Sequence, residues 1–180
     1  MPKNIVIIST SPRKNSNSHA LAEAFAEGAR QAGHAVELVS LRGKAIGFCR
    51  GCMACQKTQR CVQRDDADAI AQLLLHADVV CFATPIYFYA VSGQLKTMLD
   101  RCNPLYPADY AFREVYLLAS STDASPSAMD GAVKDIEGWV ECFPKARLAG
   151  VVRGTGVSAE GDIQGCPGVL EESRTLGRQC

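Results

Sequence analysis

Residues 5–18, IVIISTSPRKNSNS, combine a short apolar run with a polar segment rich in Ser and Asn. The first four residues are β-branched and apolar, as in a buried strand, and a helical pattern begins near His19. A strand that runs directly into a helix leaves free backbone N–H groups at the positive end of the helix dipole. Such a helix start is a common phosphate site, but Ser and Asn are also the favoured N-cap residues. The stretch therefore predicts either a phosphate loop or a polar loop with an ordinary cap.

Apolar runs and helical patterns alternate along the whole chain. Strands are predicted at 5–8, 36–41, 78–83, 115–119 and 149–152, and helices at 18–33, 65–76, from 92 onward, 128–143 and 168–177. The central strands are apolar without interruption, which is typical of parallel strands buried on both faces. The pattern predicts an α/β fold, with a five-stranded parallel sheet of order 2-1-3-4-5 between two helical layers. We expect residues 1–180 to form one domain, with a Cys-rich insertion at about 42–64.

In such sheets, ligands bind beyond the carboxyl ends of the strands. Three loops follow neighbouring strands in the predicted order: a polar loop at 9–18, an aromatic loop at 84–89 and a Ser/Thr loop at 120–126. We expect these loops to converge. A phosphate cradle beside aromatic residues suits a ligand with a phosphate at one end and a ring at the other, such as flavin mononucleotide (FMN). Alternatively, the aromatic residues cover the end of the sheet or a subunit interface.

The composition argues against several classes of protein. Nineteen basic residues balance nineteen acidic ones, so no net charge attracts nucleic acid or anionic lipid. No apolar run approaches the roughly 18 residues that span a bilayer, and the first apolar run is too short for a signal peptide. We therefore expect a cytoplasmic protein that acts without nucleic acid or a membrane.

Two segments resemble motifs of the NADPH-dependent FMN reductase-like proteins, which belong to the flavodoxin-like superfamily. Residues 9–18, STSPRKNSNS, resemble the phosphate loop of these proteins, and residues 84–96, TPIYFYAVSGQLK, resemble their flavin-ring loop and the following helix. The resemblance covers almost the whole chain. It implies a flavodoxin-like fold, bound FMN, NAD(P)H as the reductant and a homodimer or homotetramer. The electron acceptor would be a small molecule, such as a flavin or quinone, or a protein.

The resemblance also implies which residues bind the cofactor. We expect the phosphate near Ser9, Ser11, Arg13, Ser16, Asn17 and Ser18, and the ring near Pro85, Ile86, Tyr87 and Phe88. Ser121 and Thr122 are expected near the flavin from the fold alone, because no motif matches there. No catalytic acid or base is expected, since the flavin itself carries the hydride and the electrons.

Four of the nine cysteines lie within thirteen residues, as Cys49-x2-Cys52-x2-Cys55-x5-Cys61. Structural disulfides are rare in a reducing compartment, and four closely spaced thiolates suit an iron–sulfur cluster. Zinc with four thiolates usually uses two separated pairs, and free thiols packed against a neighbouring subunit are a further alternative. The spacing resembles that of the iron–sulfur flavoproteins of the same family. This implies a four-iron four-sulfur cluster near FMN and a role in electron transfer.

Residues 154–159, GTGVSA, match the dinucleotide fingerprint G-x-G-x-x-A, but Gly and Pro at 161, 165, 167 and 168 interrupt the helix that this motif must open. We predict a loop there instead. The functional alternative is a non-enzymatic flavodoxin-like electron carrier, although such carriers are often strongly acidic and this chain is neutral.

Overall fold

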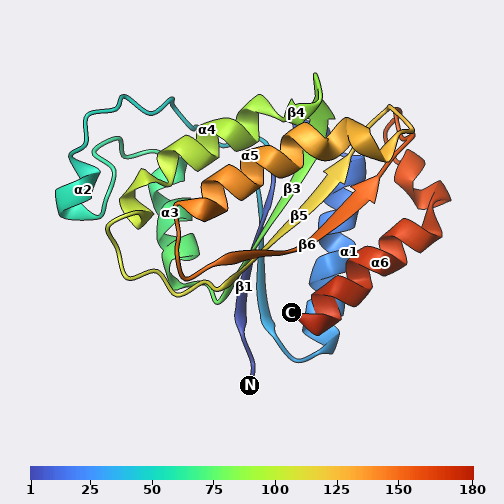
Figure 1. The fold of residues 1–180 in the computed structure, drawn as a ribbon, viewed down its shortest axis with the longest axis horizontal. Coiled ribbons are helices and arrows are strands. Elements are labelled where there is room, and N and C mark those ends of the chain that lie inside the picture. Colours follow the sequence, from blue (N-terminus) through green and yellow to red (C-terminus); the bar gives the residue numbers. More distant parts are fainter.

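A parallel sheet forms the central layer of the computed structural model, which describes residues 1–180 (Figure 1). Its parallel strands are β1 (Asn4–Ser9), β2 (Ala35–Ser40), β3 (Val79–Tyr87), β5 (Glu114–Ser120) and β6 (Arg147–Gly154). They are hydrogen-bonded in the order β2-β1-β3-β5-β6, and a short strand, β4 (Ala90–Val91), pairs with β3 in the antiparallel direction. When only the five parallel strands are numbered, β5 and β6 become the fourth and fifth strands. The predicted order 2-1-3-4-5 is therefore confirmed.

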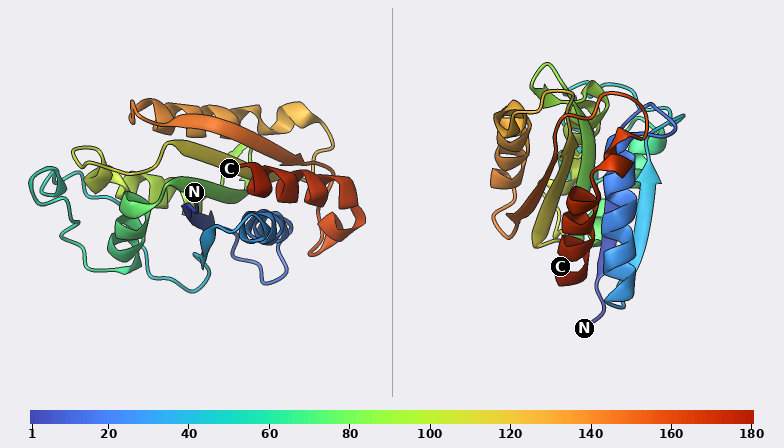
Figure 2. Two further views of the ribbon diagram at one scale, coloured as in Figure 1. Left: turned by 90° about the horizontal axis from the view of Figure 1, so that it is seen from below. Right: turned by 90° about the vertical axis from the view of Figure 1, so that its right-hand side faces the viewer.

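Helices cover both faces of the sheet (Figure 2). One face carries α1 (Asn17–Gln31) and α6 (Pro167–Gln179), and the other carries α3 (Asp66–His76), α4 (Gly93–Arg101) and α5 (Asp130–Glu141). The alternation of strand side chains creates two separate cores. In β1, Ile5 and Ile7 pack under α1, whereas Val6 and Ile8 pack on the opposite face. The predicted three-layer sandwich is thus confirmed, and none of its helices has the length and apolar character needed to cross a membrane.

Two glycines let α1 and α6 pack with their backbones in contact. A Cβ atom added to Gly28 would lie 1.9 Å from the carbonyl oxygen of Arg174, and one added to Gly177 would lie 2.1 Å from that of Phe25. The Ser173 hydroxyl donates a hydrogen bond of 2.7 Å to the carbonyl of Leu21 across the same contact. Any larger residue at either glycine would force the helices apart, so this crossing depends on the absence of side chains.

The predicted aromatic loop at 84–89 was wrong in its first four residues, which belong to a strand. β3 continues through Tyr87, and the chain turns back at once so that Tyr87 pairs with Ala90 and Ile86 with Val91. The turn residues Phe88 and Tyr89 have φ of 50° and 63°, as a tight two-residue hairpin requires. Glycine and Asn favour this left-handed backbone and aromatic residues seldom adopt it, so the turn carried no sequence signal.

The remaining elements are short. The insertion between β2 and α3 contains α2 (Cys55–Thr58), and three 3₁₀ helices lie at Asn103–Leu105, Pro126–Met129 and Asp162–Gly165. The sequence 154–159 forms a strand end and a loop, and the next helical turn is the 3₁₀ helix at Asp162. The prediction that this stretch opens no dinucleotide-binding helix is therefore confirmed.

An ion-pair network lies at the amino ends of the strands, opposite the predicted site. The Glu114 carboxylate is 2.9 Å from Lys3 Nζ and 2.7 Å from Arg147 Nη2. Burial raises the pKa of Glu114, but the hydrogen bonds and charges of Lys3 and Arg147 outweigh it and hold the pKa below its usual value. Because the unfolded chain restores the usual pKa, this carboxylate adds stability above about pH 4 that is lost as the pH falls through the folded pKa.

We expect Glu114→Gln to lower the free energy of unfolding by about 1 kcal/mol at pH 7. At pH 3 the loss should be smaller, because wild-type Glu114 is then partly protonated as well. Urea unfolding of both proteins at the two pH values measures this difference. An equal loss at both pH values would contradict the assignment.

Candidate functional site

A small hollow lies where the carboxyl ends of four strands meet. Its volume is about 60 Å³, and its walls come from the loops after β1, β5 and β6 and from the end of β3. The lining residues are Ser11, Arg13, Ser16, Asn17, Pro85, Ile86, Tyr87, Ser120, Thr122, Val157 and Ser158. The three loops predicted to converge thus do meet, and a fourth loop, after β6, joins them.

The loop between β1 and α1 presents a set of free backbone donors. Ser16 is the N-cap of α1, and its Oγ accepts a hydrogen bond from the His19 N–H at 3.4 Å. The backbone N–H groups of residues 14–18 have no acceptor within the protein. Unpaired N–H groups at the start of a fifteen-residue helix are suited to bind a phosphate. The structure therefore shows both features that the sequence suggested for this stretch. Ser16 is a helix cap, and the free backbone N–H groups are suited to bind an anion.

Arg13 and Asn17 connect this loop to the loop after β6. Arg13 Nη1 donates to the carbonyl of Ser158 at 2.8 Å, and Asn17 Nδ2 donates to that of Ala159 at 2.9 Å. The Asn17 side-chain oxygen also accepts a hydrogen bond of 3.1 Å from the Ile163 N–H. Asn17 thus fixes one wall of the hollow. Sequence reasoning missed this wall, although its position directly after a parallel strand was a usable signal.

Two residues of the predicted phosphate set lie behind the loop and do not line the hollow. Ser9 Oγ is 2.8 Å from His19 Nδ1, and Ser18 Oγ is 3.1 Å from Ser16 Oγ. Both serines are buried. Their hydroxyls are therefore positioned to support the loop from within.

Of the two residues predicted in the loop after β5, only Thr122 lines the hollow. Ser120, which was not predicted, lines it as well. Ser121 is buried and holds the loop in shape: its hydroxyl donates to the carbonyl of Asp123 at 2.7 Å, and its N–H donates to that of Gly154 at 2.9 Å.

The hairpin between β3 and β4 forms the aromatic side of the site. Pro85, Ile86 and Tyr87 line the hollow, whereas Phe88 projects fully exposed from the turn. The Tyr89 hydroxyl donates to Asp123 Oδ2 at 3.3 Å, which ties the turn to the loop after β5. Tyr89 was not among the predicted ring residues.

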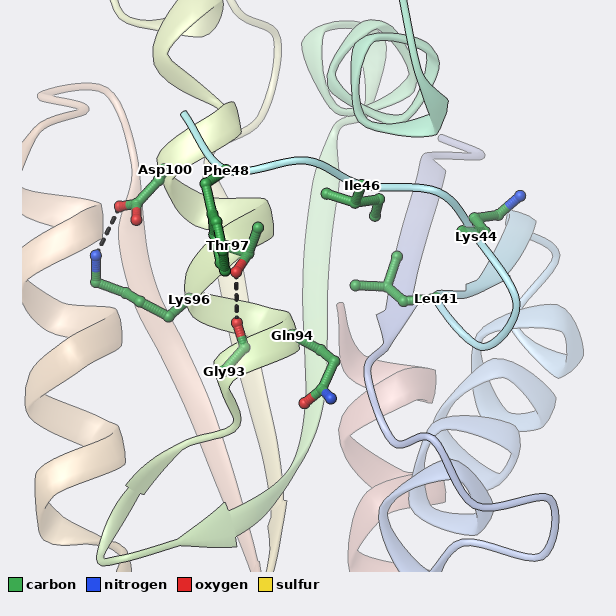
Figure 3. Close-up of a pocket in the computed structure, with 9 residues that line it drawn as sticks. All are labelled: Leu41, Lys44, Ile46, Phe48, Gly93, Gln94, Lys96, Thr97 and Asp100. Carbon is green, nitrogen blue, oxygen red and sulfur yellow. Dashed lines mark hydrogen bonds and ion pairs between the residues drawn. The ribbon is translucent and has the colours of Figure 1, made fainter. Parts of the chain in front are cut away.

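A larger groove lies between residues 41–48 and α4, the helix that begins just after the hairpin (Figure 3). Its volume is about 570 Å³, within the range of small-molecule sites. Leu41, Ile46 and Phe48 form its apolar wall, and the ion pair of Lys96 with Asp100, at 2.6 Å, lies on the facing helix. Nothing in the sequence predicted this groove, because it exists only where the insertion packs beside α4.

The four clustered cysteines lie in the insertion at different depths. Cys49 and Cys52 are exposed, Cys61 is half-buried and Cys55 is buried, and all are free thiols. No three Cys, His, Asp or Glu side chains converge on one point as metal ligands. Burial raises the pKa of the Cys55 thiol, a hydrogen bond from the Asn103 side chain opposes this rise, and the nearby Cys61 and Cys49 raise the pKa further.

Comparison with known proteins identifies the family. The model of the NADPH-dependent FMN reductase family matches residues 3–150. The chain belongs to the NADPH-dependent FMN reductase family. The matched range includes the loop after β1, the β3–β4 hairpin and the cysteine insertion. The predicted family is therefore confirmed.

Curated relatives carry the names of flavoproteins. An iron–sulfur flavoprotein of Archaeoglobus fulgidus is 38% identical over 94 residues, which is 52% of this chain and 43% of the relative. An iron–sulfur flavoprotein of Methanosarcina thermophila is 29% identical over 134 residues, which is 74% of this chain and 70% of the relative. The chain spans about half the length of most of the curated relatives that it matches best.

Solved structures confirm the flavodoxin-like fold. An NAD(P)H:quinone oxidoreductase from Methanothermobacter marburgensis superposes with a TM-score of 0.73 at 18% identity, over 99% of this chain and 98% of that one. The likeness concerns the architecture and not the residues of the site.

Proposed function

We propose that this protein is an FMN-dependent oxidoreductase that transfers electrons from NAD(P)H to an acceptor such as a flavin or a quinone. The observation that carries the proposal is the set of unpaired N–H groups at residues 14–18, next to a hollow that Tyr87 and its neighbours also line. A phosphate at one end and a ring at the other would use both features. The family of this chain agrees with this choice.

The size of the hollow suggests which part of FMN would be buried and which part would lie at the protein surface. A volume of about 60 Å³ suits a phosphate group but not a whole flavin. We propose that Ser11, Arg13 and Ser16, with the free N–H groups, hold the phosphate, and that Ser9, Ser18 and Asn17 support them. The ring would lie outside the hollow, against the exposed hairpin.

On this proposal, the ring borders Pro85, Ile86 and Tyr87, with Thr122 facing it from the loop after β5. Phe88 would meet the ring or a second subunit from the tip of the turn. The exposed aromatic side chains of the hairpin would then be covered in a homodimer or homotetramer. We further propose that residues 1–180 act together as one FMN-binding domain.

When bound, FMN supplies the hydride and electron chemistry, so the residues of this chain need only bind the cofactor, orient it and limit the access of water. The acceptor would be a small molecule or a protein. The groove of about 570 Å³ beside the hairpin is large enough for a planar organic acceptor.

A second candidate function is electron transfer by an iron–sulfur flavoprotein. Its support is the compact set Cys49, Cys52, Cys55 and Cys61 on one insertion, and the names of the relatives. Four thiolates would complete a four-iron four-sulfur cluster. FMN would then exchange single electrons with the cluster as well as pairs of electrons with a nicotinamide.

One purification separates these functions. The protein is purified without oxygen, its absorbance spectrum is recorded, and iron and acid-labile sulfide are assayed. Oxidation of NADPH and NADH is then followed with excess FMN or a quinone. We expect flavin absorbance and turnover. Absence of flavin uptake on reconstitution would overturn the proposal, and clean reduction by ferredoxin without nicotinamide turnover would favour an electron carrier.

A further inference from the structure

A second hollow, which we call the Lys14 hollow, lies beside the proposed phosphate site. Its volume is about 550 Å³, and only one of its ten lining residues is apolar. Its walls come from residues 14–16, the start of α1, Arg42 just after β2, and residues 160–164 after β6. It shares only Ser16 with the smaller hollow, so it is a separate space on the other side of the loop at 9–18.

The two cations of the Lys14 hollow have no acceptor within the protein. Most of the nineteen Lys and Arg side chains pair with a carboxylate, and Arg13 and Arg113 donate to backbone carbonyls. The side chains without a partner are Lys14, Arg30, Arg42, Arg50 and Lys57. Lys14 and Arg42 come from distant parts of the chain, yet they line the same hollow. Their charges are therefore available to a ligand.

The acidic residues of the hollow leave an excess of free positive charge. Glu23 lies one turn along α1 from His19, with its Oε1 3.6 Å from His19 Nε2. Glu160 has no partner and is the one free carboxylate among the lining residues. The unpaired backbone N–H groups at residues 14–18 lie at the same end of α1. Two free cations and these N–H groups favour an anionic ligand.

The position of the hollow indicates what kind of anion reaches it. Arg42 follows β2 and the aromatic hairpin extends β3, and β1 lies between these strands in the sheet. A ligand that meets both the hairpin and the Lys14 hollow must therefore cross the loop after β1. A nicotinamide dinucleotide is elongated in this way, with the nicotinamide at one end and adenosine at the other. In doubly wound dinucleotide-binding folds, a residue beyond the first helix contacts the adenosine ribose, and an arginine there accommodates a 2′-phosphate.

We propose that the Lys14 hollow binds the phosphorylated adenosine ribose of NADPH, and that Lys14 and Arg42 distinguish NADPH from NADH. The inference rests on the proposed function for the identity of the donor. NADPH differs from NADH by one phosphate group, which carries a charge of about −1.5 to −2 at pH 7. The Arg42 guanidinium can donate to two phosphate oxygens at once, and the Lys14 ammonium adds a point charge. Glu160 opposes the phosphate by like charge.

The binding test uses the full-length protein with excess FMN, and titration calorimetry with two nucleotides. Adenosine 2′,5′-bisphosphate carries the phosphate in question, and 5′-AMP lacks it. We expect the wild type to bind the bisphosphate about 10-fold more tightly than AMP. Lys14→Gln and Arg42→Gln should each weaken bisphosphate binding by about 3- to 10-fold, because each removes one exposed charge-assisted contact. Glu160→Gln should strengthen it. Equal affinities of the wild type for the two nucleotides would overturn the inference.

The matched control is Arg30→Gln. Arg30 lies in the last turn of the same helix, is exposed and also has no partner, so this variant loses the same net charge at the far end of α1. We expect its affinity for the bisphosphate to equal that of the wild type. A loss as large as that of Arg42→Gln would show a general effect of charge and would contradict a site at the Lys14 hollow.

Steady-state kinetics give the second readout. In Lys14→Gln and Arg42→Gln, the KM for NADPH should rise by about 3- to 10-fold, while kcat and the KM for NADH stay unchanged. An unchanged KM for NADPH, or an equal rise for NADH, would overturn the assignment. If neither nicotinamide reduces the flavin, the proposed function fails. The calorimetry then still decides the site: bisphosphate binding that is lost in the two variants supports it, and binding that is equal to AMP removes it.

Discussion

Replacing Arg13 by Glu should weaken the binding of FMN by about 100-fold and leave the binding of riboflavin unchanged. The Arg13 side chain lines the hollow beside the free N–H groups, and its present partner, the Ser158 carbonyl, is exposed. A charge-assisted hydrogen bond contributes about 1.5–3 kcal/mol, which corresponds to a loss of about one to two orders of magnitude in affinity, and the new carboxylate adds repulsion. Riboflavin lacks the phosphate and therefore does not use this contact. Quenching of flavin fluorescence measures both dissociation constants.

The matched control is Lys14→Glu. Lys14 carries the same charge one residue further along the loop, it is equally exposed, and it does not line the hollow. We expect at most a small loss of FMN affinity from this change, because exposed charges are screened by salt. Equal losses in the two variants would show that the effect is one of net charge. A parallel loss of riboflavin affinity in Arg13→Glu would place the ring, and not the phosphate, at Arg13.

Gly28→Ala should lower the free energy of unfolding by about 3 kcal/mol. The added methyl group would meet the backbone of Arg174, and a backbone cannot rotate away as a side chain can. The helices α1 and α6 must then separate, and the contacts along their crossing are lost together. Urea unfolding monitored by circular dichroism measures the change in midpoint.

Gly138→Ala is the control, because Gly138 also lies inside a helix but has no atom within 4 Å of the added Cβ. Both substitutions gain the same helix propensity, about 0.8–1 kcal/mol. We therefore expect Gly138→Ala to stabilise the protein. The difference between the two variants isolates the close approach at Gly28, and stabilisation by both would contradict this packing.

Local signals predicted much of the fold and part of the site. The strand order followed from the apolar strands and from the rules for parallel sheets. Asp65 and Ser92, where two of the predicted helices begin, each accept the N-cap hydrogen bond that their residue type favours. The proposed phosphate loop was readable because all of its parts lie within ten consecutive residues. The sequence did not show which serines of this loop line the hollow and which are buried behind it, since only the packing of β1 against α1 turns Ser9 and Ser18 inward.

By itself, the sequence determined the features that depend on residues a few positions apart: the alternation of strands and helices, the caps and the loop at 9–18. The left-handed hairpin turn at Phe88, the wall at Ser158 and the contacts of Arg101 became visible only in the folded chain. In the sequence, Arg101 is an ordinary basic residue in the last turn of a helix. Its partners lie 36 to 54 residues away, so a periodic pattern cannot reveal them. They meet because the insertion packs against α4, where a buried guanidinium must find acceptors.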